Sequence, residues 1–376
     1  MTGVQTCALP ISLDINPNSA LARNGRGEAY LELGQIDLAR ADFDAAGELD
    51  RSNPTILSNI GHLKVNYFGD CETGWRYLED ALAKNPDDAR ANRDKGLAHA
   101  QLDEHEAAMQ ALEAAAELEP GNYENYSAMA SILLRQEDYE GAVNAFTRAI
   151  ETYQPQGRTD PSTFIEGYLR RAQVRLVMGS EAMDDDPEAS TAAYEAVIAD
   201  ANSVLEKYED RYPELAGTAH YQKGLAQRML GRYGESIESL TKAIQTTSGA
   251  GVNYLADAYI RRGICWQNQG YGALARKDFE RAISVNFESP LPHFWIGLSH
   301  AAEGNYREAI NHYSDAADLR DDFARAFVNR GLAYYQLGEF EKAIDNFNEA
   351  ISHEPLEPEH YFKRGMAHMR LDQYEK

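Results

Sequence analysis

The sequence predicts an all-α fold, a right-handed superhelical solenoid of antiparallel helix pairs. Two observations carry this prediction. Residues 324–355 contain two successive apolar patterns of helical period, separated by Gly338 and closed by Pro355. A small residue in the same setting as Gly331 then recurs about every 34 residues along most of the chain. A helical hairpin repeated at a fixed interval builds a solenoid.

The stretch 324–355 shows how each hairpin is built. Its first half places Phe327, Gly331, Tyr334 and Leu337 on one face, and its second half places Phe340, Ala343, Phe347 and Ala350 on another. Gly331 and Ala343 are the smallest residues on these two faces. We therefore expect the two helices to cross closely at this point, with aromatic rings filling the space on either side.

The same register runs through two regular blocks and a less regular middle. The small position is filled in order by Gly27, Gly61, Gly96, Ala130, Ala172, Gly224, Gly263, Gly297, Gly331 and Gly365. With the aromatic and proline positions around them, these residues resemble the tetratricopeptide repeat family, and the resemblance covers about nine-tenths of the chain. It implies stacked helical hairpins whose first helices line a concave binding surface.

The register divides the chain into five segments. We expect a non-native tail at 1–11, a repeat array with a partial unit and four repeats at 12–153, a linker at 154–163, a diverged repeat with an acidic loop insertion at 164–216, and an array of four repeats plus a truncated one at 217–376. The acidic insertion lacks the alternating oxygen ligands of a calcium loop, which favours a solvated loop.

Both ends are expected to be incomplete. Residues 1–11 resemble a translated sequencing adapter, and the following residues fit the end of a cut repeat. No polar capping helix follows the last repeat, so we expect the gene product to continue beyond Lys376. The cytoplasm is the default expectation for the compartment, and a signal peptide ahead of the native start stays open as the alternative.

Composition narrows the class of partner. The 376 residues carry a formal net charge of −24, with 43% hydrophobic residues. Long-range repulsion then disfavours nucleic acid and anionic membranes, and no apolar run is long enough to span a bilayer. We expect a protein or peptide partner that is apolar with basic flanks, and the oligomeric state stays open.

No catalytic chemistry is predicted. The chain has no phosphate-binding glycine loop and no HExxH motif, and its three cysteines have no metal-ligand spacing. The ten histidines are scattered, and His293 and His300 do not share a ligand spacing on one helical face. We therefore expect no catalytic residues, no cofactor and no metal, and a protein that is not an enzyme.

The family resemblance places a candidate groove on the first helices of the last repeats. It implies that residues three before, one after, and four or five after the small residue point inward. Here these positions are apolar: Tyr221, Leu225, Ile260, Ile264, Phe294, Leu298, Val328, Leu332, Tyr335, Phe362, Met366 and Met369. The equivalent early positions, such as Asn24 and Ser58, are mostly polar. The alternative is that these apolar side chains pack against adjacent helices.

Basic residues just before the glycine form a second candidate set, Arg262, Arg330 and Arg364. They could pair with side chains of a second helix, or they could donate to a bound peptide. Phe294 and Leu298 replace the polar pair with which one subgroup of the family clamps the carboxylates of chaperones, so such a clamp is not expected.

The function predicted from these features is a non-catalytic scaffold that binds a peptide or protein segment in its concave groove. The alternative is the partner- or substrate-recruiting region of a larger enzyme, such as a glycosyltransferase or a signalling kinase. For the scaffold we expect Phe294→Ala with Phe362→Ala to weaken partner capture without loss of helicity. Ser58→Ala with Ser127→Ala should have little effect.

Overall fold

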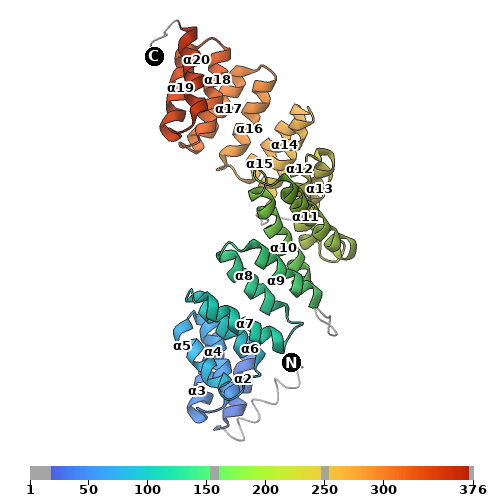
Figure 1. Cartoon of the computed structure of the whole chain (residues 1–376), viewed down its shortest axis with the longest axis vertical. Helices are drawn as coiled ribbons and strands as arrows, with labels where there is room; N and C mark the ends of the chain where they lie inside the picture. Colours follow the sequence, from blue (N-terminus) through green and yellow to red (C-terminus); the bar gives the residue numbers. More distant parts are fainter. Residues whose placement is uncertain (1–17, 153–160, 247–253, 372–376) are drawn as a thin grey trace. The chain divides into compact units, whose positions relative to one another are not determined.

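The computed structural model describes residues 18–152, 161–246 and 254–371. Within these ranges the chain forms helices α2 to α20 and no strand, and successive helices pair antiparallel (Figure 1). The expected non-native tail at 1–11 and most of the expected linker at 154–163 lie outside the described residues. Contacts divide the chain into two units, residues 1–174 and 175–376, and the boundary falls inside α10 (Ser162–Glu181).

The first unit contains four helix pairs ahead of α10. Their bounds are α2 Ala20–Glu32, α3 Ile36–Leu49, α4 Pro54–Phe68, α5 Cys71–Leu82, α6 Ala89–Gln101, α7 His105–Leu118, α8 Tyr123–Arg135 and α9 Tyr139–Thr152.

The second unit begins within α10 and holds the remaining helices. Their bounds are α11 Pro187–Tyr208, α12 Pro213–Met229, α13 Tyr233–Thr246, α14 Leu255–Asn268, α15 Gly272–Val285, α16 Pro290–Ala302, α17 Tyr306–Leu319, α18 Ala324–Gln336, α19 Phe340–His353 and α20 Pro358–Arg370.

The turns inside the helix pairs share one backbone feature, a residue with positive φ. Seven residues after the small position, the chain passes through a left-handed conformation, which glycine adopts without a steric penalty. Gly304 and Gly338 do so with φ of 80° and 79°. Two repeats place an acidic residue there instead, Asp103 and Glu137, both with φ of 59°. These two turns therefore carry backbone strain that the glycine turns lack.

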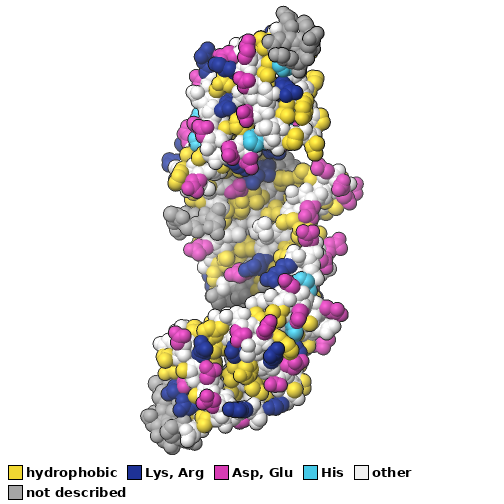
Figure 2. Space-filling model, turned by 90° about the vertical axis from the view of Figure 1, so that its left-hand side faces the viewer, with side chains coloured by type: hydrophobic (Ala, Val, Ile, Leu, Met, Phe, Trp, Pro, Cys, Tyr) yellow, Lys and Arg dark blue, Asp and Glu magenta, His cyan; other side chains and the backbone are white. Residues whose placement is uncertain are grey.

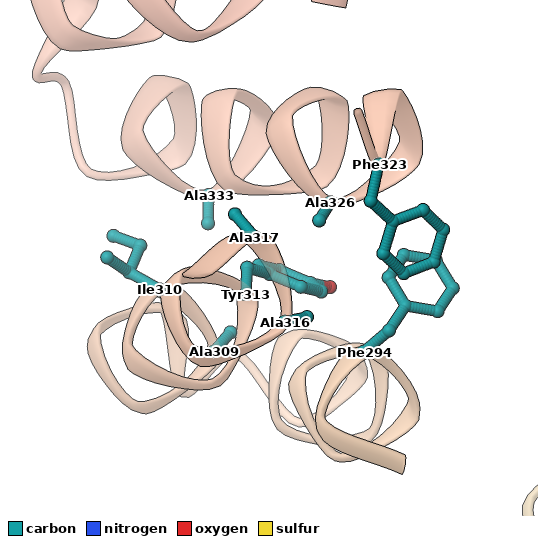
Figure 3. Packing of buried hydrophobic residues seen from close by; sticks show 9 residues of the cluster. All are labelled: Phe294, Ala309, Ile310, Tyr313, Ala316, Ala317, Phe323, Ala326 and Ala333. Atoms are coloured by element: carbon teal, nitrogen blue, oxygen red, sulfur yellow. The ribbon is translucent and has the colours of Figure 1, made fainter. Parts of the chain in front are cut away.

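In most regular helix pairs the two helices meet at a glycine of the first helix, which we call a glycine notch. A methyl group added at Gly263 would lie 2.5 Å from Cε1 of Phe279, and one added at Gly297 would lie 2.6 Å from Cε1 of Tyr313. The ring from the second helix therefore occupies the space that the missing side chain leaves. Figure 3 shows Tyr313 lying among the alanines of α17 and α18. The close crossing predicted at the small residue is confirmed.

The diverged repeat differs from the expectation of an inserted loop. Only residues 182–186, which include the acidic triplet Asp184, Asp185 and Asp186, lie outside a helix, because α10 runs to Glu181 and α11 begins at Pro187. The Asp186 side chain caps α11 by accepting from the backbone N–H of Ala189 at 3.0 Å. The extra residues thus lengthen both helices, to 20 and 22 residues, and leave a short turn between them.

The notch of this repeat is Gly179 rather than Ala172. A methyl group at Gly179 would lie 2.8 Å from Cε1 of Tyr194. The hydroxyl of Ser190 donates to the Gly179 carbonyl at 2.6 Å, as the hydroxyl of Ser236 donates to Gly224 at 2.7 Å in the next repeat. The closest approach of the two helices lies nearer the turn than in other repeats, because both helices are longer at that end. The spacing of small residues alone did not predict this position.

Candidate interaction surfaces

Four of the predicted groove residues lie in the hydrophobic core, since Ile260, Ile264, Phe294 and Val328 are all buried. The ring of Phe294 lies against that of Phe323, with centroids 5.2 Å apart (Figure 3). These side chains pack between consecutive helix pairs. For them the structure agrees with the alternative given above, that the apolar side chains pack against adjacent helices and do not line a groove.

Tyr221 is also engaged inside the protein. Its hydroxyl donates to Oδ2 of Asp257 at 2.6 Å, and its ring stacks on Tyr254 at 4.7 Å between centroids. Burial and the neighbouring Asp257 carboxylate raise the pKa of the phenol, so Tyr221 stays protonated as a hydrogen-bond donor.

The remaining predicted apolar residues keep accessible surface. Leu225 is half-buried on α12. On α16, α18 and α20, Leu298, Leu332 and Met366 occupy one repeat position and are half-buried. We call the accessible set on these three helices the apolar stripe: Leu298, Leu332, Tyr335, Phe362, Met366 and Met369. Phe362 and Met369 are the most exposed, at 68% and 60%.

The predicted basic residues are tied to neighbouring helices. Arg262 forms a bidentate ion pair with Asp278 and also donates to the Thr241 hydroxyl. Arg330 donates to the Asn346 side chain at 2.6 Å. Arg364 donates to Oδ1 of Asn348 at 2.8 Å. These contacts favour the structural interpretation, since a bound peptide would have to displace them.

A polar cluster in the first unit was missed at the sequence level. Asn59 of α4 donates to Oδ1 of Asn24 at 2.9 Å and to Oε1 of Glu28 at 2.7 Å, both on α2. Arg90 of α6 donates to the side-chain Oδ1 of Asn59. On the same helices His62 Nδ1 lies 2.7 Å from Oδ2 of Asp94. The sequence signal for this cluster is a polar residue within the apolar pattern of each first helix, at Asn24, Asn59 and Asp94, which recur at about the repeat length.

This cluster borders a pocket of about 270 Å³ in the first unit. The pocket is lined by Glu28, Leu31, Glu32, Phe43, Asn59, His62, Tyr67 and Arg90. Among its charged groups, the carboxylates of Glu28 and Glu32 outnumber the single guanidinium of Arg90. The pocket therefore fits a polar or basic group better than an acidic one.

The surface charge is dispersed. On the face that Figure 2 shows, acidic and basic side chains alternate with hydrophobic ones over the described helices, and neither charge forms a continuous patch. Among the described residues, no helix combines the length and the apolar character that crossing a membrane requires.

The structure also brings together histidines that the sequence analysis treated as scattered. His293 of α16 lies beside His312 and Asp315 of α17. His300 stacks on His312, with ring centroids 5.7 Å apart and planes 4° from parallel. The sequence-based comparison of His293 with His300 considered positions along one helix, whereas this grouping involves two helices.

Family models agree with the repeats seen in the structure. Models described as tetratricopeptide repeat match residues 324–355, 123–155, and 11–54, 67–123 and 185–251, and one described as TPR repeat matches residues 299–338. The chain belongs to the tetratricopeptide repeat family. The matched segments fall in both units, and two of them, 123–155 and 324–355, cover the helix pairs α8–α9 and α18–α19.

Individual relatives resemble parts of this tetratricopeptide repeat chain. Human tetratricopeptide repeat protein 13 is 31% identical over 105 residues, which are 28% of this chain and 12% of that protein. Among solved structures, YrrB, titled a TPR protein with an unusual peptide-binding site, has 24% identity and a TM-score of 0.40, covering 59% of this chain and 98% of YrrB. MamA has 21% identity and a TM-score of 0.39, covering 47% of this chain and 95% of MamA.

Proposed function

We propose that this tetratricopeptide repeat chain is a non-catalytic scaffold that holds a peptide or protein segment against the apolar stripe. The observation that carries the proposal is that Leu298, Leu332 and Met366 recur at one repeat position with surface left uncovered by packing. Exposed Phe362 and Met369 extend the same set on α20. Large apolar side chains that share one face are typical of interaction sites.

The affinity available from such a stripe is moderate. Burying one large apolar side chain contributes about 1.5–3 kcal/mol before the costs of ordering the partner. Three or four such contacts reach the micromolar range without a strong polar anchor. The net charge of −24 then favours partners with basic flanks, chiefly by accelerating their encounter with the scaffold.

A phage-displayed random peptide library selected on the purified chain tests the proposal. We expect the selected peptides to carry large apolar residues flanked by Lys or Arg. Phe362→Ala combined with Met369→Ala should then weaken binding of the selected peptides at least tenfold, with an unchanged helical circular dichroism spectrum. Both side chains are exposed, so their removal leaves the core intact.

The matched control removes exposed apolar side chains from the turns. Phe287 and Leu356 are exposed at 73% and 94% and lie between helices of the same unit. Phe287→Ala with Leu356→Ala should leave peptide binding unchanged. Equal loss in both double variants, or selected peptides that are acidic and polar, would contradict the proposed surface.

The substitutions chosen from the sequence alone, which include Phe294→Ala and Ser58→Ala, are weaker tests of the binding surface. Phe294→Ala would open a cavity in the core, so any loss of binding would follow from unfolding. Ser58 is fully buried and its hydroxyl has no hydrogen-bond partner, so Ser58→Ala would change stability rather than the surface.

A further inference from the structure

Three potential metal ligands meet between the two helices of one repeat. Oδ2 of Asp315 lies 3.4 Å from Nδ1 of His293 and 3.8 Å from Nδ1 of His312. The ligand atoms of the three residues all lie within 4.8 Å of one another. The two imidazoles come from different helices, so the grouping exists only in the folded repeat.

Both imidazoles present a ring nitrogen that the protein leaves unsatisfied. The Nδ1 atoms of His293 and His312 are buried and make no hydrogen bond, although each lies within ion-pair distance of Asp315. Two buried nitrogens and one carboxylate oxygen therefore lie close together as potential electron-pair donors. A buried ring nitrogen without a partner costs free energy that a bound cation would recover.

The spacing fits tetrahedral coordination. Zinc binds imidazole nitrogen and carboxylate oxygen at about 2.0–2.2 Å, which places neighbouring tetrahedral ligands about 3.3–3.6 Å apart. The two nitrogen-to-oxygen distances, 3.4 and 3.8 Å, are close to this range. Small rotations of these side chains, without movement of either helix, would therefore bring the three atoms around an ion.

A third imidazole lies next to the group. The ring of His300 stacks on that of His312, with centroids 5.7 Å apart and planes 4° from parallel, and this contact restricts the orientation of the His312 ring.

We propose that His293, His312 and Asp315 bind one divalent transition-metal ion of the zinc class, with solvent completing the coordination. The exposed fraction of the Asp315 side chain, 53%, gives the ion a path to the site and leaves one side open to water. Two imidazoles with one carboxylate suit Zn²⁺, Co²⁺ or Ni²⁺ and disfavour Mg²⁺ and Ca²⁺, which prefer oxygen ligands. The bound ion would link α16 to α17 independently of any partner at the apolar stripe.

Metal titration of the tag-free, chelator-treated chain tests this proposal. We expect calorimetry with ZnCl₂ to show one equivalent bound, and CoCl₂ to give the intense visible absorption of tetrahedral cobalt. The melting temperature should rise with Zn²⁺ and stay unchanged with MgCl₂. His293→Gln, His312→Gln and Asp315→Asn should each weaken Zn²⁺ binding at least tenfold.

His105→Gln is the matched control. His105 is also partly buried with an unpaired Nδ1, and it belongs to no potential ligand group among the described residues. This variant should bind Zn²⁺ like the unmodified chain. Failure to bind Zn²⁺, or equal affinity in Asp315→Asn, overturns the proposal. Asp315→Asn is decisive because this half-exposed side chain can change without disturbing the core.

Discussion

Arg262 and Asp278 form a bidentate ion pair across α14 and α15, with Nε to Oδ2 at 2.8 Å and Nη2 to Oδ1 at 2.7 Å. Arg26 and Asp42 form the same pair across α2 and α3, at 2.6 and 2.7 Å. The aspartate is nearly buried in both pairs. The arginine before the small residue therefore ties the first helix of its repeat to the second.

Arg262→Ala should destabilise the chain by about 2–3 kcal/mol, because it leaves the Asp278 carboxylate buried without its partner. Chemical unfolding followed by circular dichroism measures this change. Arg40→Ala removes one arm of an exposed pair with Asp44 and should cost less than about 0.5 kcal/mol. A double-mutant cycle between Arg262 and Asp278 that gives no coupling would refute the role assigned to the pair.

Substitution of glycine by alanine is expected to change stability in opposite directions at two of the small positions, Gly263 and Gly365. Gly263→Ala should destabilise by about 1–3 kcal/mol, because its methyl group would overlap the ring of Phe279. Gly365→Ala should stabilise by up to about 1 kcal/mol, since no described atom lies within 4 Å of the added methyl group and alanine favours a helix. Melting temperatures that change in the same direction for both variants would show that packing does not decide the outcome.

The turn after α8 offers a stabilising change. Glu137 has φ of 59° at the position where other repeats place glycine. Glu137→Gly should raise the free energy of unfolding by about 0.5–1 kcal/mol, because it relieves the left-handed strain of a residue with a side chain. The opposite change is the control. Gly338 has φ of 79°, so Gly338→Ala places a side chain in the left-handed conformation and should lower stability by a similar amount. A lower melting temperature for Glu137→Gly would contradict this assignment.

Acid should weaken the repeat around α12 first. Burial lowers the pKa of His220 below its ordinary value of 6.5, while Glu209 opposes the shift and Lys242 and Lys223 add to it. The unfolded chain then binds the proton more tightly than the folded one. Stability is therefore full above pH 6.5 and falls as the pH drops below it. His220→Gln should flatten the dependence of the melting temperature on pH between 7 and about 5.5, and an unchanged slope would exclude His220 as its source.

The helical hairpins could be predicted because their signals are local. Residues 324–355 form α18 and α19, and Gly338 adopts the left-handed turn expected of it. The accessibility of the candidate groove depends instead on the next helix pair. Phe294 shares its repeat position with Phe362, yet only Phe294 is covered, because Phe323 of the following repeat lies against it. Sequence spacing gives the position of a side chain on its helix, and neighbouring helices determine its exposure.

The histidine cluster shows the same limit. His293 and His300 lie on one helix, and His312, which lies next to both, comes from the following helix. Periodicity along one helix does not report which residues of two helices meet. The sequence-based expectation that no metal binds considered spacings along single helices, so it did not include this grouping.

The glycine notches also bear on how the chain folds. In the regular repeats the small residue and the ring that fills it are only 16 residues apart, as in Gly263 with Phe279 and Gly331 with Phe347. Contacts this short in sequence close with little loss of chain entropy, which favours rapid folding. A hairpin can therefore collapse as soon as its second helix leaves the ribosome, before later repeats are synthesised. Duplication or loss of a whole repeat during evolution would likewise leave each remaining notch with the ring or leucine side chain that fills it.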